Sequence, residues 1–168
     1  IKWQDEKTLF IKGGQSYKAV SAKVEGDYSN AAFFAALNEL GSEIEITGLT
    51  PKSLQGDKVY EKNFALLGKG TPTINISDCP DLGPILFAVA AVKGGGVFTG
   101  TRRLKIKESD RASAMAEELA KFGIQVDVME NEIVVHKGTL VRPNELLNSH
   151  NDHRIAMSFS MAGLRTSG

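Results

Sequence analysis

Four charged side chains crowd the five positions from Lys107 to Arg111, directly before a stretch whose apolar period predicts a helix. An arginine guanidinium binds a carboxylate or a phosphate through two hydrogen bonds, and a lysine adds a point charge. A carboxylate beside such cations, here Glu108, can accept or donate a proton, because the cations set its protonation. The cluster therefore has the residue types needed to bind an anion and to move a proton next to it.

Similar groups open other predicted helices. Asp27 and Asp81 each precede a helix that is apolar nearly all round, and residues 152–154 place an aspartate, a histidine and an arginine before a third. A helix N-terminus presents free N–H groups and roughly half a positive charge, which favours anions. Several such ends meeting near Arg111 and Arg154 would form a strong phosphate or carboxylate site.

Each residue also has a plain structural interpretation. An aspartate at a helix start most often caps the helix, which applies to Asp27, Asp81 and Asp110 taken singly. Mixed charges such as Glu108 and Arg111 often form a solvent-exposed ion cluster. No spacing of histidine, aspartate or glutamate demands a metal, so we expect no metal site. The choice between these interpretations depends on which helix starts come together.

The elements that must position these groups recur along the chain. The spacing from Asp27 to Asp81 nearly equals that from Asp57 to Asp110, which indicates repeated supersecondary units. Each unit has one helix that is apolar all round and must therefore be buried. We expect three such helices, roughly parallel, with their N-termini at one end of the domain. They are predicted near residues 29–40, 84–92 and 154–164.

Striped helices and strands surround these three helices in the prediction. A stripe of Ala112, Met115 and Leu119 predicts an amphipathic helix, and Tyr60 and Phe64 belong to a second stripe. Alternating or turn-bounded apolar residues predict the strands. These lie within residues 1–24, at 42–49 and 96–101, and in a hairpin over 124–138 that turns near residues 130–131.

Composition excludes several classes of protein. Among 168 residues, 20 basic side chains balance 20 acidic ones. The net charge therefore gives no overall attraction to nucleic acid or to a membrane surface. Cys79 is the only cysteine, which excludes a disulfide framework and fits a reducing compartment. No apolar run reaches the length of a membrane span. We expect a cytoplasmic protein, and we interpret the ends at Ile1 and Gly168 as those of a fragment.

Five motifs in order resemble an enzyme family. They are "EGDYSNAAFF", "SLQGD", "DCPDLGP", "IKESDR" and "NDHRIAM". The pattern is similar to 5-enolpyruvylshikimate-3-phosphate synthase from about Lys12 to the end. The resemblance implies two similar domains, each of three βαβαββ units, with buried parallel helices that point into the cleft between the domains. We therefore expect an incomplete enolpyruvyl transferase-like α/β domain, with residues 1–24 as a remnant of the first domain and 25–168 as a truncated second domain.

The resemblance also implies a reaction in aromatic amino acid biosynthesis. The enolpyruvyl group of phosphoenolpyruvate passes to the 5-hydroxyl of shikimate 3-phosphate, phosphate is released, and no metal or organic cofactor is required. Asp81 matches a candidate base, and Glu108 matches the glutamate proposed to handle the proton at C3. The matching substrate-binding residues are Lys107, Arg111, Arg154, Asp27 and His153.

Two alternatives stay open at this point. The chain could be a stand-alone domain of this fold that binds phosphorylated ligands or another protein, or it could belong to the related transferase acting on UDP-N-acetylglucosamine. The resemblance implies that half of the cleft is missing, so we expect the fragment alone to be inactive and able to self-associate, whereas the full-length enzyme would be monomeric. The segment over residues 66–81 is also shorter than the matching segment in many members of the family, which carry an extra hairpin there.

The same reasoning predicts a specific arrangement. Arg111 and Arg154 should lie close enough to share one anion, with Glu108 beside it and Asp81 across the cleft. Because the two guanidinium groups would otherwise repel each other, we expect acidic side chains to pair with them. The predicted partners are Glu108, Asp110 and Asp152.

Overall fold

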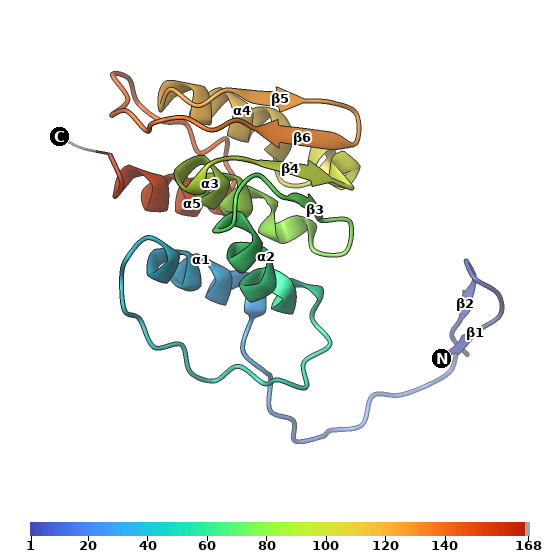
Figure 1. The fold of residues 1–168 in the computed structure, drawn as a ribbon. Coiled ribbons are helices and arrows are strands. Elements are labelled where there is room, and N and C mark those ends of the chain that lie inside the picture. Colours follow the sequence, from blue (N-terminus) through green and yellow to red (C-terminus); the bar gives the residue numbers. More distant parts are fainter. Residues whose placement is uncertain (167–168) are drawn as a thin grey trace.

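Three helices run side by side through the computed structural model, which describes residues 1–166 (Figure 1). At one end, Arg154 contacts Asp81, and at the other the Arg165 Nη1 group donates a hydrogen bond of 3.2 Å to the Leu40 carbonyl. Contacts at both matching ends mean that the helices are parallel, as predicted. They are α1 (Tyr28–Glu39), α3 (Gly83–Lys93) and α5 (His153–Gly163).

Burial differs among these helices. Every α3 residue from Gly83 to Ala91 is buried, as an apolar sequence on all sides predicts. Helices α1 and α5 each bury one face, and Phe34 on α1 is 48% exposed. The expectation that all three are buried all round is therefore wrong for α1 and α5, which keep one side toward solvent.

Among the described residues, none of the helices has both the length and the apolar character that a membrane span requires.

A four-stranded sheet covers α3 and the neighbouring helix α4 (Figure 1). The strand order is β3-β4-β6-β5, with β3 and β4 parallel and the other two pairs antiparallel. In chain order these elements form one complete βαβαββ unit. Their bounds are β3 (Thr73–Asn75), β4 (Gly96–Thr99), α4 (Arg111–Lys121), β5 (Val126–Val128) and β6 (Glu132–Val135). The predicted hairpin and the strand at 96–101 are confirmed.

Aromatic side chains join the sheet to the helices. The Phe87 ring on α3 meets the Phe98 ring on β4 edge to face, with centroids 4.7 Å apart, and Phe122 stacks on Phe159 at 5.7 Å. Such pairs add specific geometry to the burial of apolar area. The C-terminal end of α4 is thereby packed against the middle of α5.

Short 3₁₀ turns lead into three of the helices. They are η1 (Gly56–Val59) before α2 (Tyr60–Leu67), η2 (Pro80–Leu82) before α3, and η3 (Thr101–Ile106) before α4. The predicted stripes are confirmed, since Tyr60 and Phe64 on α2 and Met115 and Leu119 on α4 are all buried.

The first unit does not repeat the sheet of the second. Residues 41–55 contain no strand, so the strand predicted at 42–49 is wrong. The Asn38 side chain offers a physical reason, because its amide donates to the Ile44 carbonyl at 2.8 Å and accepts from the Ile44 N–H at 2.7 Å. These are the two groups that a neighbouring strand would otherwise satisfy.

The N-terminal segment lies away from the helices (Figure 1). Strands β1 (Lys2–Trp3) and β2 (Leu9–Phe10) pair with each other, and every residue from 1 to 25 is exposed. The prediction of strands within residues 1–24 is wrong beyond β2, because residues 11–24 contain no strand, and Val20 and Val24 are 83% and 90% exposed. A lone two-stranded hairpin offers no face for a further strand to bury. The domain boundary near residue 25 stays a prediction.

Candidate anion-binding site

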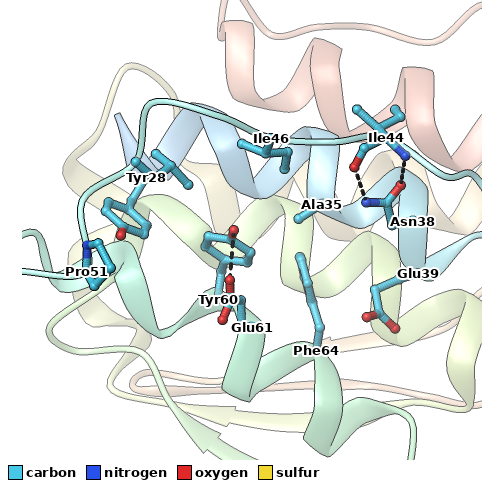
Figure 2. Close-up of a pocket in the computed structure, with 11 residues that line it drawn as sticks. Tyr28, Ala35, Asn38, Glu39, Ile44, Ile46, Pro51, Tyr60, Glu61 and Phe64 are labelled. Atoms are coloured by element: carbon cyan, nitrogen blue, oxygen red, sulfur yellow. Dashed lines mark hydrogen bonds between the residues drawn. The ribbon is translucent and has the colours of Figure 1, made fainter. Parts of the chain in front are cut away.

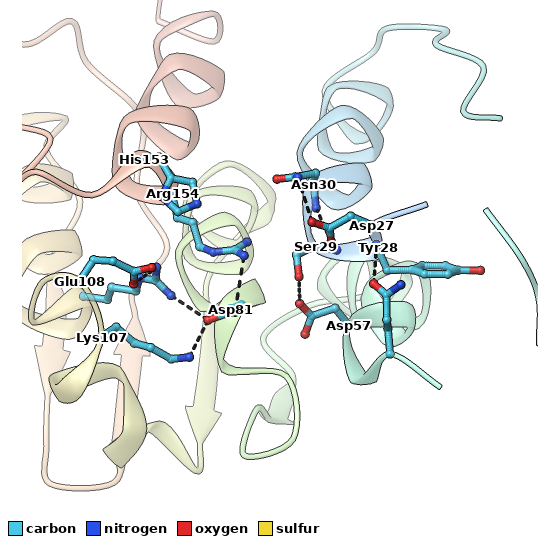
Figure 3. A network of polar contacts seen from close by, with 12 residues as sticks. Asp27, Tyr28, Ser29, Asn30, Asp57, Asp81, Lys107, Glu108, His153 and Arg154 are labelled. Carbon is cyan, nitrogen blue, oxygen red and sulfur yellow. Dashed lines mark hydrogen bonds and ion pairs between the residues drawn. The ribbon is translucent and has the colours of Figure 1, made fainter. Parts of the chain in front are cut away.

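The starts of α1, α3 and α5 and the residues before α4 meet on one side of the molecule (Figure 3). Two of these helices begin at aspartate caps. Asp27 Oδ1 accepts the Ser29 N–H at 2.8 Å, and Asp152 Oδ1 accepts the Arg154 N–H at 2.9 Å. Because a cap fixes where a helix begins, it also fixes which side chains project from the first turn.

Arg111 is the centre of the charged group, and its side chain has no exposed surface. Its Nε lies 2.7 Å from Asp152 Oδ2, its Nη1 lies 2.8 Å from Asp81 Oδ1, and its Nη2 lies 2.6 Å from Glu108 Oε2. Burial alone would lower the pKa of Arg111, but the Asp152 hydrogen bond and the three negative charges raise it above its ordinary value. A permanently charged guanidinium thus joins three segments of the chain.

Asp81 receives three cations on one carboxylate. Lys107 Nζ and Arg111 Nη1 each lie 2.8 Å from Oδ1, and Arg154 Nη2 lies 3.5 Å from Oδ2. Burial would raise the pKa of Asp81, but the Lys107 hydrogen bond and the charges of Arg154, Lys107 and Arg111 hold it below its usual value. The carboxylate is therefore ionised.

The position of Asp81 corrects the expected arrangement. The prediction places it across a cleft from the arginines, but its carboxylate contacts both of them, with Oδ1 2.8 Å from Arg111 Nη1 and Oδ2 3.5 Å from Arg154 Nη2. The turn η2 places it at the start of α3, which runs between α4 and α5. The two arginines thus share the carboxylate of the protein itself.

Arg154 keeps one buried nitrogen without a partner. The residue is 9% exposed, and its Nη1 makes no hydrogen bond within residues 1–166. Leaving a buried donor unsatisfied costs about 1–3 kcal/mol, more for a charged group. An anion that reaches this nitrogen would remove that penalty.

The other charged residues of the opening motif differ in their contacts. Glu108 is more open than Lys107, with 52% of its side chain exposed against 22%. Asp110 does not pair with either arginine, so that prediction is wrong. Its carboxylate instead caps α4, accepting the Ser113 N–H at 3.2 Å and the Ser113 hydroxyl at 2.9 Å.

Ser29 and Asp57 face this group from the side of α1 (Figure 3). The Ser29 hydroxyl donates to Asp57 Oδ2, and Asp57 is buried. Burial raises the pKa of Asp57; the Ser29 hydrogen bond opposes that rise, and the charge of Asp81 adds to it. Asp27 caps α1 beside them. His153 lies at the rim, with 57% of its side chain exposed and Nδ1 4.0 Å from Asp152 Oδ1.

A model of the EPSP synthase family, described as 3-phosphoshikimate 1-carboxyvinyltransferase, matches residues 1–168. The chain belongs to this family. A 3-phosphoshikimate 1-carboxyvinyltransferase of Clostridium acetobutylicum is 41% identical over 174 residues, covering 95% of this chain and 40% of the relative. One from Clostridioides difficile is 35% identical over 176 residues, with shares of 95% and 40%.

A solved EPSP synthase structure from Acinetobacter baumannii also matches, with a TM-score of 0.53 and 28% identity. The match covers 86% of this chain and 41% of that one. The predicted family and the predicted α/β fold class are confirmed. The chain spans about two fifths of the length of these EPSP synthase relatives.

Sequence reasoning missed Ser29 and Asp57 as neighbours of the charged group. The available signal was the repeat, because the spacing that aligns Asp27 with Asp81 also aligns Asp57 with Asp110, at the start of the next striped helix. Asp57 therefore occupies the position in the first unit that matches the charged motif of the second unit.

Two other places on the molecule have features of a binding site. A hollow of about 470 Å³ lies between α1, α2 and residues 44–51 (Figure 2). Its charged lining residues are Glu39 and Glu61, so it does not suit an anion. Elsewhere in the described chain, Glu117, Glu118 and His150 place possible metal-ligand atoms within 4.8 Å of one another. There the Glu118 carboxylate already accepts hydrogen bonds from Lys121 and from the Asn148 N–H.

Proposed function

We propose that this chain supplies one half of the active site of an EPSP synthase. The complete enzyme would transfer the enolpyruvyl group of phosphoenolpyruvate to the 5-hydroxyl of shikimate 3-phosphate and release phosphate. The observation that carries this proposal is the meeting of Lys107, Arg111 and Arg154 around Asp81 at the helix starts, with one buried Arg154 nitrogen unpaired. Residues 25–168 would form most of the second domain, and residues 1–24 would belong to the first.

Phosphoenolpyruvate would bind to the two arginines. It carries a carboxylate and a phosphate, the groups that guanidinium binds through paired hydrogen bonds. The free Arg154 Nη1 offers a first donor, and Glu108 can release the Arg111 Nη2 because its own carboxylate is half exposed. Lys107 would contact shikimate 3-phosphate, and Asp27 and His153 would line the cleft.

Asp81 and Glu108 would handle the protons. With its pKa held low by three cations, Asp81 is a weak base in the empty site. Anionic substrates that pair with the arginines would reduce this effect and raise the pKa of Asp81, so it would become a stronger base when the site is loaded. It could then accept the proton of the 5-hydroxyl, while Glu108 would handle the proton at C3. The reaction as proposed needs no metal and no organic cofactor.

The test is substrate titration in the complete enzyme that carries this chain. Arg111→Ala or Arg154→Ala should raise the Kd of phosphoenolpyruvate at least tenfold, because truncating one partner of a buried charge pair costs about 2–5 kcal/mol. Arg102→Ala is the matched control, since Arg102 is exposed and forms an ion pair with Glu130 on the surface. Normal phosphoenolpyruvate binding by both site variants would contradict the assigned roles.

Two further measurements separate activity from binding. Glu108→Gln should lower turnover and leave substrate affinity nearly unchanged, because the exchange removes a proton and little volume. This chain alone should release no phosphate from the two substrates, since the reaction depends on both being held in register. Turnover by the chain alone would refute the two-domain proposal, whereas phosphate-ligand binding without any transfer in the complete protein would favour a binding domain.

A further inference from the structure

The segment from Leu146 to Asp152 delivers the start of α5 to the candidate site. It contains no helix or strand, yet its backbone is held locally. The Asn148 Oδ1 accepts the His150 N–H at 2.8 Å, and the Asp152 N–H donates to the Ser149 carbonyl at 2.9 Å. The conformation of this segment therefore decides where Asp152 and Arg154 lie.

Two consecutive residues of this segment have left-handed backbone angles. His150 has a φ of 50° and Asn151 a φ of 58°, and among residues 1–166 no other residue except glycine has a positive φ. This conformation costs about 1–2 kcal/mol per residue, although asparagine and histidine adopt it more readily than most. Such a pair persists only where the surrounding structure holds it.

The buried carboxylate of Glu118 on α4 holds this segment. Its side chain has no exposed surface, its Oε2 accepts the Asn148 N–H at 2.9 Å, and its Oε1 lies 3.2 Å from His150 Nε2. Lys121 Nζ lies 2.8 Å from the same Oε1 and donates to the Leu146 carbonyl at 3.2 Å. Burial would raise the pKa of Glu118, but these donors hold it below its usual value, so the carboxylate is charged.

Helix α4 thus contacts the segment at two points. Arg111 at its first turn binds Asp152. Glu118, about two turns further along, accepts the Asn148 N–H and contacts the His150 side chain, four and two residues before Asp152. We propose that Glu118 is a positioning residue for the anion site. Its contacts hold His150 and Asn151 in the left-handed conformation, and this conformation places Asp152 and Arg154. This inference rests on the proposed function, which assigns Arg154 to phosphoenolpyruvate.

The contacts of Glu118 favour this role over metal binding. A cation held by Glu117, Glu118 and His150 would have to displace the Lys121 ammonium, which already lies against Glu118 Oε1. The Lys121 ammonium supplies the positive charge at that point, and it ties the same carboxylate to the segment through Leu146.

The test compares Glu118→Gln with Glu117→Gln, a matched control because Glu117 is the adjacent, exposed glutamate on the same helix. In Glu118→Gln, hydrogen exchange at the amides of residues 148–152 should be faster. In the complete enzyme the KM for phosphoenolpyruvate should rise about tenfold with less than a threefold change in kcat, the pattern of lost binding rather than lost chemistry. Glu117→Gln should change neither.

A rescue variant separates positioning from general loss of stability. Asn151→Gly accepts a positive φ without strain, so it should recover part of the KM in the Glu118→Gln background. Faster exchange with an unchanged KM, or unchanged exchange, would overturn the positioning role. If Glu118→Gln does not fold, Lys121→Met is the replacement variant. It removes the hydrogen bond from Lys121 Nζ to the Leu146 carbonyl, and the same changes in hydrogen exchange and KM are expected.

Inorganic phosphate distinguishes this proposal from the proposed function. If the complete enzyme transfers no enolpyruvyl group, the proposed function fails, but the rise in melting temperature of this chain with added phosphate still reports the anion site. A smaller rise in Glu118→Gln than in Glu117→Gln would support the positioning role. An equal rise in both variants would refute it.

Discussion

Two sides of the candidate site are built on different physical terms. The arginine side consists of Lys107, Arg111 and Arg154 with the carboxylates of Asp81, Glu108 and Asp152, and its ion pairs join α3, α4 and α5. The serine side consists of Asp27, Ser29 and Asp57, whose hydrogen bonds join only α1 and η1. The first side therefore holds the helix starts together and offers cations, whereas the second supplies a polar wall without a cation of its own.

The two sides also shift the same chemical group in opposite directions. Cations hold the pKa values of Asp81 and Asp152 below the usual range against the effect of burial. At Asp57 burial dominates, and its pKa is raised. The comparison teaches that burial of a carboxylate says little about its charge until its partners are counted.

The largest expected effect is the loss of Arg111. Arg111→Met should lower the free energy of unfolding by about 3–5 kcal/mol, because three carboxylates lose the buried cation that pairs with them. Urea denaturation of this chain measures the change. Ser29→Ala on the serine side is the comparison variant, with an expected loss of about 1 kcal/mol for one hydrogen bond. A larger loss for Ser29→Ala would reverse the proposed difference between the sides.

The second prediction concerns pH. Asp81 has a folded pKa below its reference value of 3.8, so its stabilising contribution is present above that pH and is lost as the pH falls through the folded pKa. Asp57 has a raised folded pKa, so its contribution is present below 3.8 and is lost as the pH rises through the folded pKa.

Unfolding of Asp81→Asn and Asp57→Asn from about pH 3 to about pH 8 checks these signs. As the pH rises, the free energy of unfolding of Asp81→Asn should decrease relative to that of the parent chain. That of Asp57→Asn should increase relative to the parent chain. Parallel curves for the two variants would mean that the two carboxylates have similar environments.

The third prediction tests the cap on the serine side. Asp27→Ala should cost about 1 kcal/mol of unfolding free energy, because two N–H groups at the start of α1 lose their acceptor. Asp27→Asn is the control, since an amide oxygen can still accept these hydrogen bonds. If alanine and asparagine were equally costly, the charge of Asp27 rather than its capping would be the important property.

The smallest effect on stability is expected at Glu108. Half of its side chain is exposed, so Glu108→Gln should change the free energy of unfolding by less than about 0.5 kcal/mol even though it pairs with Arg111. Thermal unfolding of the same preparation used for turnover measurements checks this. A loss as large as that of Arg111→Met would place Glu108 among the structural ion pairs.

Local signals in the sequence predicted the helices well. The ends of α1, α3 and α5 lie within about two residues of their predicted positions, because caps and apolar runs are properties of neighbouring residues. The strand expected at residues 42–49 failed because a strand needs a partner, and the side chain of Asn38 takes that place at Ile44. The alternation of Ile44 and Ile46 with polar residues indicates only that one side of this segment is partly buried. A loop that packs against α1 and α2 has the same pattern.

The site was predicted by residue type more than by geometry. The motifs identified the charged residues, but the position of Asp81 depends on the turn η2 and on how α3 packs between two helices, which no local pattern encodes. The role of Glu118 was also missed. Its spacing from Met115 and Phe122 places it beside the apolar stripe of its helix, but its partners Asn148 and His150 lie about thirty residues away and depend on the fold.

The exposure of residues 1–25 makes this segment the natural target of a protease. Lys12, Lys18 and Lys23 are exposed and lie outside any helix or strand, the condition in which trypsin cuts most readily. The first side-chain anchor to the body comes later, where Glu25 accepts hydrogen bonds from Ser53 and Gln55. Digestion after Lys23 would therefore remove β1 and β2 without removing any helix or the Asp27 cap of α1.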